Sequence, residues 1–158
     1  MNKPYTRVAC CIDRDDMADI VVREGLRLAG GEGTSLRVVH VVAPPHTLAS
    51  GPFGYTAPIV EMRDESIAWL EGVTGAIAGA TPVVLDGSPS REICSWARAN
   101  EIDLIVAAAD RGLVERAMLG GFASYVAYHA PCSVLLVHRP AVAAGASVEA
   151  TPATSQAL

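Results

Sequence analysis

Five short apolar runs, separated by stretches with helical periodicity, constrain the fold of this chain more than any other feature. They are continuous runs rather than alternating patterns, which is typical of strands covered by helices on both faces. Right-handed crossovers between such strands predict an α/β fold: one domain with a five-stranded parallel sheet and helices on both faces. The expected strands are Arg7–Ile12, Ser35–Val42, Thr81–Leu85, Leu104–Ala108 and Ser133–Val137.

The stretches between these runs carry helix start and stop signals. Asp15 or Asp16 offers a carboxylate to cap the first helix, and Ser88-Pro89 is a favourable start for the third. The segment Pro44–Pro58 has no period and predicts a loop, either a lid or partner surface or a tolerated insertion. The expected helices run from Asp15 or Asp16 to Gly30, from Val60 to Ala78, from Ser88 to Asn100 and from Gly121 to His129.

Length and composition restrict the class of protein. The 158 residues fit one domain, which we place at residues 1–139. Residues 140–158 are mostly Ala, Ser, Thr and Pro, and we expect this tail to be disordered. The formal net charge of −5 and the lack of a basic cluster argue against nucleic acid as a partner. With no long apolar run and no signal-peptide core, we expect a cytoplasmic protein without membrane contact.

The 4 cysteines have no zinc-binding spacing. Cys10 and Cys11 are adjacent in an expected strand, so their side chains should face opposite sides of the sheet. We interpret the cysteines as buried thiols. The sequence therefore predicts no metal site.

A small set of polar residues and glycines follows the expected strands, where ligands of parallel sheets bind. Asp13 directly follows the first strand and either accepts a hydrogen bond from a ligand or helps to cap the first helix. Gly120-Gly121 opens the last helix, where free N–H groups favour an anion, although a tight turn explains the same residues. Arg111 and Arg116 either hold a phosphate or are solvated surface charges.

The two histidines near these segments show no catalytic arrangement. His40 is expected to be a hydrogen-bonded core residue, and His129 is placed to interact with the last carbonyls of its helix. Neither has a Ser, Cys or Asp at a spacing that suggests a triad. We therefore predict no catalytic residues.

In the order and spacing of six segments, the chain resembles the universal stress protein family, and the last of these segments is the most specific. The resemblance covers the chain from about Val8 to Arg139. The matching segments are Val8–Asp13, Leu36–Val42, Gly87–Ile93, Asp103–Val106, Leu119–Gly121 and His129–Val137.

This resemblance implies a Rossmann-like domain with strand order 3-2-1-4-5. It also implies a homodimer joined through the last strand, Ser133–Val137. Many members bind ATP, with the adenosine held at the positions of Asp13 and Val41. Their phosphates lie on a loop of pattern G-x-x-G, nine residues, then G followed by Ser or Thr.

The chain departs from that phosphate pattern at several positions. Ala107-Ala108-Ala109 stands where the first glycine is expected, and the second falls on Asp110 or Arg111, with Gly112 close by. Gly120 is kept, but the hydroxyl residue after it is Gly121. Each lost hydroxyl contact costs about 1–3 kcal/mol, so two or three losses would move micromolar binding towards millimolar.

Three functions follow as hypotheses. The first is a non-enzymatic stress-response module whose site keeps the adenosine end of an adenine nucleotide and holds its triphosphate weakly. For that site we name Asp13, Val41, Ala108, Arg111, Gly112, Gly120 and Gly121. The second is an ATP-binding switch with slow or no hydrolysis. The third is an adenylating enzyme, which would need an intact pyrophosphate-gripping loop.

Overall fold

The computed structural model describes residues 5–29, 36–43, 56–109 and 121–139, and side chains from residue 59 onward in the second helix. Five parallel strands form one sheet in the order β3-β2-β1-β4-β5, which confirms the predicted fold class and strand order. In chain order the elements are β1 (Val8–Cys11), α1 (Ala18–Leu28), β2 (Leu36–Val42), α2 (Thr56–Gly75), β3 (Thr81–Asp86), α3 (Pro89–Ala99), β4 (Leu104–Ala108), α5 (Phe122–His129) and β5 (Ser133–Val137).

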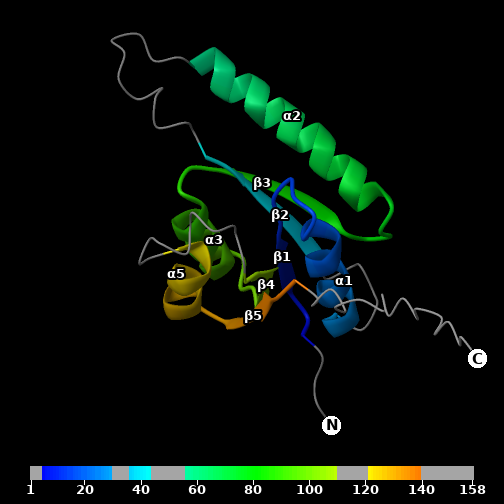
Figure 1. Cartoon of the computed structure of the whole chain (residues 1–158), viewed down its shortest axis with the longest axis vertical. Helices are drawn as coiled ribbons and strands as arrows, with labels where there is room; N and C mark the ends of the chain where they lie inside the picture. The colour runs from blue at the N-terminus through cyan, green and yellow to red at the C-terminus, as the bar shows by residue number, and fades with distance from the viewer. Residues whose placement is uncertain (1–4, 30–35, 44–55, 110–120, 140–158) are drawn as a thin grey trace, which may run out of the picture.

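Helices cover the sheet in two layers (Figure 1). α1 packs on β1 and β4, and the long helix α2 lies along β2 and β3. On the other face α3 packs against α5, and α3 also contacts β2 and β3. This three-layer arrangement buries β1, the central strand, completely.

Side chains of β1 alternate between two hydrophobic cores, as the alternation of a strand requires. Cys10 belongs to the core under α1 and α2, whereas Cys11 belongs to the core under α3 and α5. The predicted opposite orientation of these cysteines is therefore confirmed. Cys10, Cys11 and Cys94 are buried as expected, and Cys132 is half-buried.

α1 approaches β1 closely because residue 25 is a glycine. A Cβ atom on Gly25 would lie 2.1 Å from the sulfur of Cys10. The Cys10 thiol donates a hydrogen bond to the carbonyl of Val21 at 3.6 Å. Burial raises the pKa of Cys10 to about 12, so the thiol stays protonated and packs as a small apolar group.

The boundaries of α2 differ from the prediction. The helix begins at Thr56 and ends at Gly75, so the predicted span Val60–Ala78 was shifted and the predicted loop to Pro58 was too long. Proline is tolerated in the first turn of a helix, because N–H groups there have no partner within the helix. After Gly75 the chain turns tightly, with the N–H of Ile77 donating to the carbonyl of Thr74 at 2.9 Å.

The start of α1 also differs from the prediction. Asp15 accepts the N–H of Met17 at 3.0 Å in the turn before the helix. Asp16 instead forms an ion pair with Arg139, which follows β5. That pair holds the pKa of Asp16 below its ordinary value. The N-cap of α1 is Met17 and no side chain caps the helix, so neither aspartate takes the predicted capping role, although Asp15 stabilises the turn that leads into it.

The strands, α3 and α5 agree with the predicted boundaries within one residue, whereas α1 begins at Ala18 and ends at Leu28, inside its predicted span by two residues or more at each end. Pro89 occupies the first turn of α3 after Ser88, and Asn100 ends that helix, its side chain donating to the carbonyl of Trp96 at 2.8 Å. The glycine stop at Gly30, most of the loop from Pro44 and the tail 140–158 lie outside the described residues, so the domain boundary at 139 stays a prediction. Among the described residues, no helix combines the length and hydropathy needed to cross a membrane.

Candidate functional site

The carboxyl ends of β1 and β2 bring Asp13 and Val41 together. Cys11 of β1 lies in register with Val39 of β2, and the N–H of Ile12 extends the pairing to the carbonyl of Val39 at 2.9 Å. The next residue along β1 is Asp13, so its carboxylate reaches the edge beside the end of β2. Both residues line a cleft of about 330 Å³. Its other lining residues are Arg14, His40, Val42, Ala43, Met62, Glu65 and Ser66.

His40 fixes the geometry on the β2 side of this cleft. Its side chain is buried, and Nδ1 lies 3.1 Å from the carbonyl oxygen of Ile12. A carbonyl oxygen only accepts, so this contact assigns the proton to Nδ1. The same nitrogen is 3.7 Å from Oδ1 of Asp13. The prediction of a hydrogen-bonded core histidine is confirmed, and the buried imidazole stands next to the Asp13 carboxylate.

Asp13 is held by its own loop as well as by His40. Its Oδ1 accepts the backbone N–H of Arg14 at 2.9 Å. The N–H of Arg14 precedes α1, whose N-cap is Met17, so this hydrogen bond of Asp13 does not cap the helix. Half of its side-chain surface remains open to solvent, at 45% exposure. An ionised carboxylate held at an open cleft can accept hydrogen bonds from hydroxyl or amino groups of a ligand.

A second, smaller hollow lies at this edge on the α3 and α5 face, among the described residues. It is lined in part by Asp13, His40 and Val41 and, from the helices, by Ile93 and Phe122. Its volume is only about 10 Å³, about the space of one water-sized probe. A ligand that contacts Asp13 and Val41 therefore has room on the α2 side of the sheet.

The end of β4 has a different character. Ala107 and Ala108 are 1% and 9% exposed, and Ala108 pairs with Val137 of β5. The N–H of Ala109 donates to the carbonyl of Val137 at 2.8 Å, so it is engaged with the sheet. Ala108 is absent from the residues that line the 330 Å³ cleft. Among the described residues, the end of β4 presents the methyl groups of Ala107, Ala108 and Ala109.

The other predicted phosphate residues are only partly described. Gly121 is the N-cap of α5, with φ −53° and ψ 160°, and no side chain caps that helix. Arg111, Gly112 and Gly120, together with Arg116, lie outside the described residues. The structure thus brings together Asp13 and Val41 of the predicted set, and it places Ala108 and Gly121 on the β4 side.

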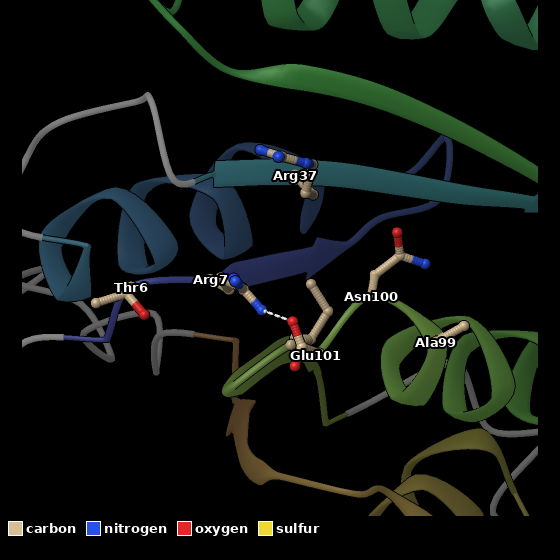
Figure 2. Close-up of a pocket in the computed structure, with 7 residues that line it drawn as sticks. Thr6, Arg7, Arg37, Ala99, Asn100 and Glu101 are labelled. Carbon is tan, nitrogen blue, oxygen red and sulfur yellow. Dashed lines mark hydrogen bonds and ion pairs between the residues drawn. The ribbon is translucent and has the colours of Figure 1, made fainter.

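A larger hollow, of about 450 Å³, lies at the opposite edge of the sheet (Figure 2). It is lined by residues before β1, by Arg37 of β2 and by the turn after α3, and an ion pair joins Arg7 to Glu101 within it. Glu101 has φ 52°, a left-handed conformation that suits the end of α3. Since ligands of parallel α/β sheets bind beyond the carboxyl ends of the strands, this hollow is not the candidate nucleotide site.

Sequence reasoning missed residues of α2 and of the loop after Asp13. Arg14, Glu65 and Ser66 line the cleft, and Trp69 supports it from behind His40. Ser66 is 5% exposed, but a single serine in a helix gives no sequence signal that it will be buried. The proximity of Arg14 to Trp69 could not be predicted from the sequence, because it depends on where α2 passes the loop after β1. Among the described residues, no three metal-ligating side chains cluster, so the geometry offers no metal centre there.

Comparisons with known proteins agree on one family. The family model described as "Universal stress protein family" matches residues 4–138. A universal stress protein of Synechocystis is 26% identical over 151 residues, which cover 84% of this chain and 97% of that protein.

Solved structures show the same fold. The universal stress protein UspA of Lactobacillus plantarum has a TM-score of 0.63 at 23% identity, covering 86% of this chain and 99% of that chain. A family protein of Arabidopsis thaliana with AMP bound has a TM-score of 0.60 at 18% identity, covering 90% and 97%. A universal stress protein in complex with cAMP has a TM-score of 0.59 at 20% identity, covering 86% of this chain and 99% of that chain. With the match over residues 4–138, the chain belongs to the universal stress protein family.

Proposed function

We propose that this protein is a non-enzymatic stress-response module that binds an adenine nucleotide by its adenosine end and holds a triphosphate weakly. The observation that carries the proposal is the meeting of Asp13 and Val41 at one open cleft beside the buried His40. Two proteins of the same fold were solved with AMP or cAMP, ligands that have a single phosphate. These ligands share the adenosine group that the cleft would receive.

The weak binding that we propose for a triphosphate follows from the residues at the end of β4 and at the start of α5. Where the phosphate pattern expects a glycine, the chain places the methyl group of Ala108, and Gly121 replaces a hydroxyl residue. A phosphate near Ala108 would meet a buried alanine whose neighbouring N–H, from Ala109, already donates within the sheet. Loss of one charge-assisted hydrogen bond costs about 1–3 kcal/mol. Binding energy should therefore come mostly from the adenosine.

A homodimer through β5 belongs to the same proposal. β5 and β3 are the two edges of the sheet, and β3 contains Pro82, which cannot donate to a further strand. β5 has no proline, and its residues Val134–Val137 are only partly buried. An apolar edge with unpaired backbone groups favours pairing with a second copy. We expect this dimer to be cytoplasmic.

Thermal shift and calorimetry with purified protein test the proposed ligand. Adenosine, AMP and cyclic AMP should each stabilise the protein, because a ligand that binds only the folded state raises the melting temperature. Guanosine and GMP serve as matched controls and should stabilise it less. Absence of any shift with all three adenine compounds at millimolar concentration would contradict adenine-nucleotide binding.

An ATP-binding switch remains a second candidate, since Gly120 of the phosphate pattern is retained in the sequence. Mass spectrometry of the purified protein separates the two functions. Stoichiometric ATP or ADP carried through purification would favour the switch. A preparation free of nucleotide, with no phosphate release from ATP above background, would favour the non-enzymatic module.

A further inference from the structure

Three planar groups from three different elements pack against one another beside the cleft. The guanidinium carbon of Arg14 lies 5.4 Å from the ring centre of Trp69, which belongs to α2. The Trp69 ring in turn meets the His40 ring edge-to-face, with centres 5.2 Å apart and an angle of 77°. His40 is anchored to the backbone at Ile12. The indole is thus fixed from behind and supports the arginine.

Arg14 is the member of this group that faces the ligand space. It lines the 330 Å³ cleft together with Asp13 and Val41, whereas Trp69 is not among the lining residues. Among the described residues, the side chain of Arg14 forms no hydrogen bond or ion pair, and its guanidinium contacts the indole of Trp69. Because the guanidinium carbon lies over the indole on one side and the side chain lines the cleft on the other, the guanidinium can receive a second planar group from the cleft.

The position of Arg14 separates two kinds of contact with a nucleotide. α2, which carries Trp69, covers β2 and β3, whereas the phosphate segment follows β4 on the other side of β1. Arg14 therefore lies at the end of the cleft where Asp13 and Val41 would hold the adenosine. A planar cation at that end is placed for a base rather than for the phosphates.

We propose that Arg14, supported by Trp69, is the surface on which the nucleobase stacks; this inference rests on the proposed binding of adenine nucleotides. Stacking on a guanidinium uses the π-face of the base and does not require a phosphate. The contact should therefore contribute equally to adenosine, AMP and ATP. It should also depend on the planarity of the side chain and not only on its charge.

Calorimetry on the full chain tests this with Arg14→Gln and Arg14→Lys. Both variants should lose affinity about 5- to 30-fold for adenosine and by the same factor for AMP, because Lys keeps the charge but lacks the plane. Trp69→Leu, which leaves Arg14 without its support, should lose less. Arg23→Gln, at an exposed position on α1, is the matched control and should leave the affinities unchanged. Circular dichroism and melting curves identify any variant that fails to fold.

Three results would overturn the inference. A loss confined to AMP and ATP and restored by Arg14→Lys would assign Arg14 to the phosphates. Unchanged affinities in Arg14→Gln, with the wild type binding normally, would remove Arg14 from the site while leaving the proposed function intact. A wild type that binds neither adenosine nor AMP would instead contradict the proposed function itself, and the stacking contact with it.

Discussion

The carboxyl edge of the sheet has two halves that differ in chemistry. At β1 and β2, charged and polar side chains meet around an open cleft: Asp13 stands beside the buried His40, and Arg14 lies over Trp69. At β4, Ala107 and Ala108 end the strand with buried methyl groups. The first half can still recognise a ligand by hydrogen bonds and stacking, while the second has lost the glycine and hydroxyl of the phosphate pattern. We infer that the two ends of the proposed nucleotide site have diverged separately.

Asp13→Ala should produce the largest effect, because it removes the carboxylate at the retained half. Hydrogen bonds to a charged group contribute about 1.5–3 kcal/mol, so affinity for adenosine, AMP and ATP should fall about 10- to 100-fold by calorimetry. Asp19→Ala, an acidic residue in the first turn of α1, is the control. Unchanged adenosine binding in Asp13→Ala would mean that the ligand binds elsewhere, and it would contradict the proposed difference between the two halves of the edge.

Restoring the phosphate pattern should sharpen the contrast from the other side. The double variant Ala108→Gly with Gly121→Ser places a glycine at the last position of β4 and a hydroxyl at the N-cap of α5. One regained hydrogen bond, about 1.5 kcal/mol, should raise ATP affinity about tenfold and leave adenosine unchanged. Competition calorimetry measures the ratio. If the ratio of ATP to adenosine affinity stays at its wild-type value, these two positions do not explain the weak triphosphate hold.

Val134→Pro tests whether the proposed dimer forms through the outer edge of β5, next to β4, and separately from the cleft at β1 and β2. Along a strand, the backbone groups of successive residues point alternately to its two sides. The carbonyl of Val137 accepts the N–H of Ala109 on the β4 side. Val134 lies an odd number of residues away, so its backbone groups point outward from the sheet. Proline there removes an outward N–H, and sedimentation should show a monomer. Affinity for adenosine should change less than about twofold, since the cleft lies beyond β1. Val134→Ala, which keeps the N–H, should remain dimeric; a wild type that sediments as a monomer would contradict the dimer itself.

Asp103→Asn should have the smallest effect and none on the ligand, because Asp103 lies at the amino edge. Burial opposes its ionisation, but hydrogen bonds from the N–H groups of Thr6 and Arg7 and from the Thr6 hydroxyl hold its pKa below the ordinary value. A depressed pKa stabilises the fold above the unfolded pKa of about 4, and this stability is lost as pH falls through the folded value.

The expected destabilisation in Asp103→Asn is about 1 kcal/mol at neutral pH, reduced by solvent screening. Urea unfolding at pH 7 and at pH 3 measures it. The difference between wild type and variant should shrink at the lower pH. A constant difference at both pH values would show that charge is not what Asp103 contributes, and a weakened adenosine affinity would connect the two edges.

Much of the fold could be predicted because each strand is a short apolar run with a turn signal after it. The five strands agree with their predicted bounds within one residue. Gly87, which has a positive φ, and Asn100 mark chain reversals that depend on local chemistry. The start of α2 was missed because Pro58 reads as a helix breaker, although it lies in the first turn, where proline is tolerated.

The site was predictable only in part. Asp13 follows β1 and Val41 lies near the carboxyl end of β2, and because these two strands are neighbours, strand order alone brings the residues together. Arg14 and Trp69 are separated by 55 positions in the sequence, and their contact depends on the path of α2 over the sheet. Sequence patterns report which face of a helix is apolar, but they do not report which exposed side chain of a loop that helix will meet.

The ratio of ATP to AMP affinity in the wild-type protein tests the central contrast most directly. Calorimetry on one nucleotide-free preparation should give adenosine, AMP and ATP dissociation constants within about threefold of one another, because the retained half binds what the three share. An ATP dissociation constant in the low micromolar range and about 30-fold or more below that of AMP would mean that the β4 half still grips the triphosphate, and it would contradict the account.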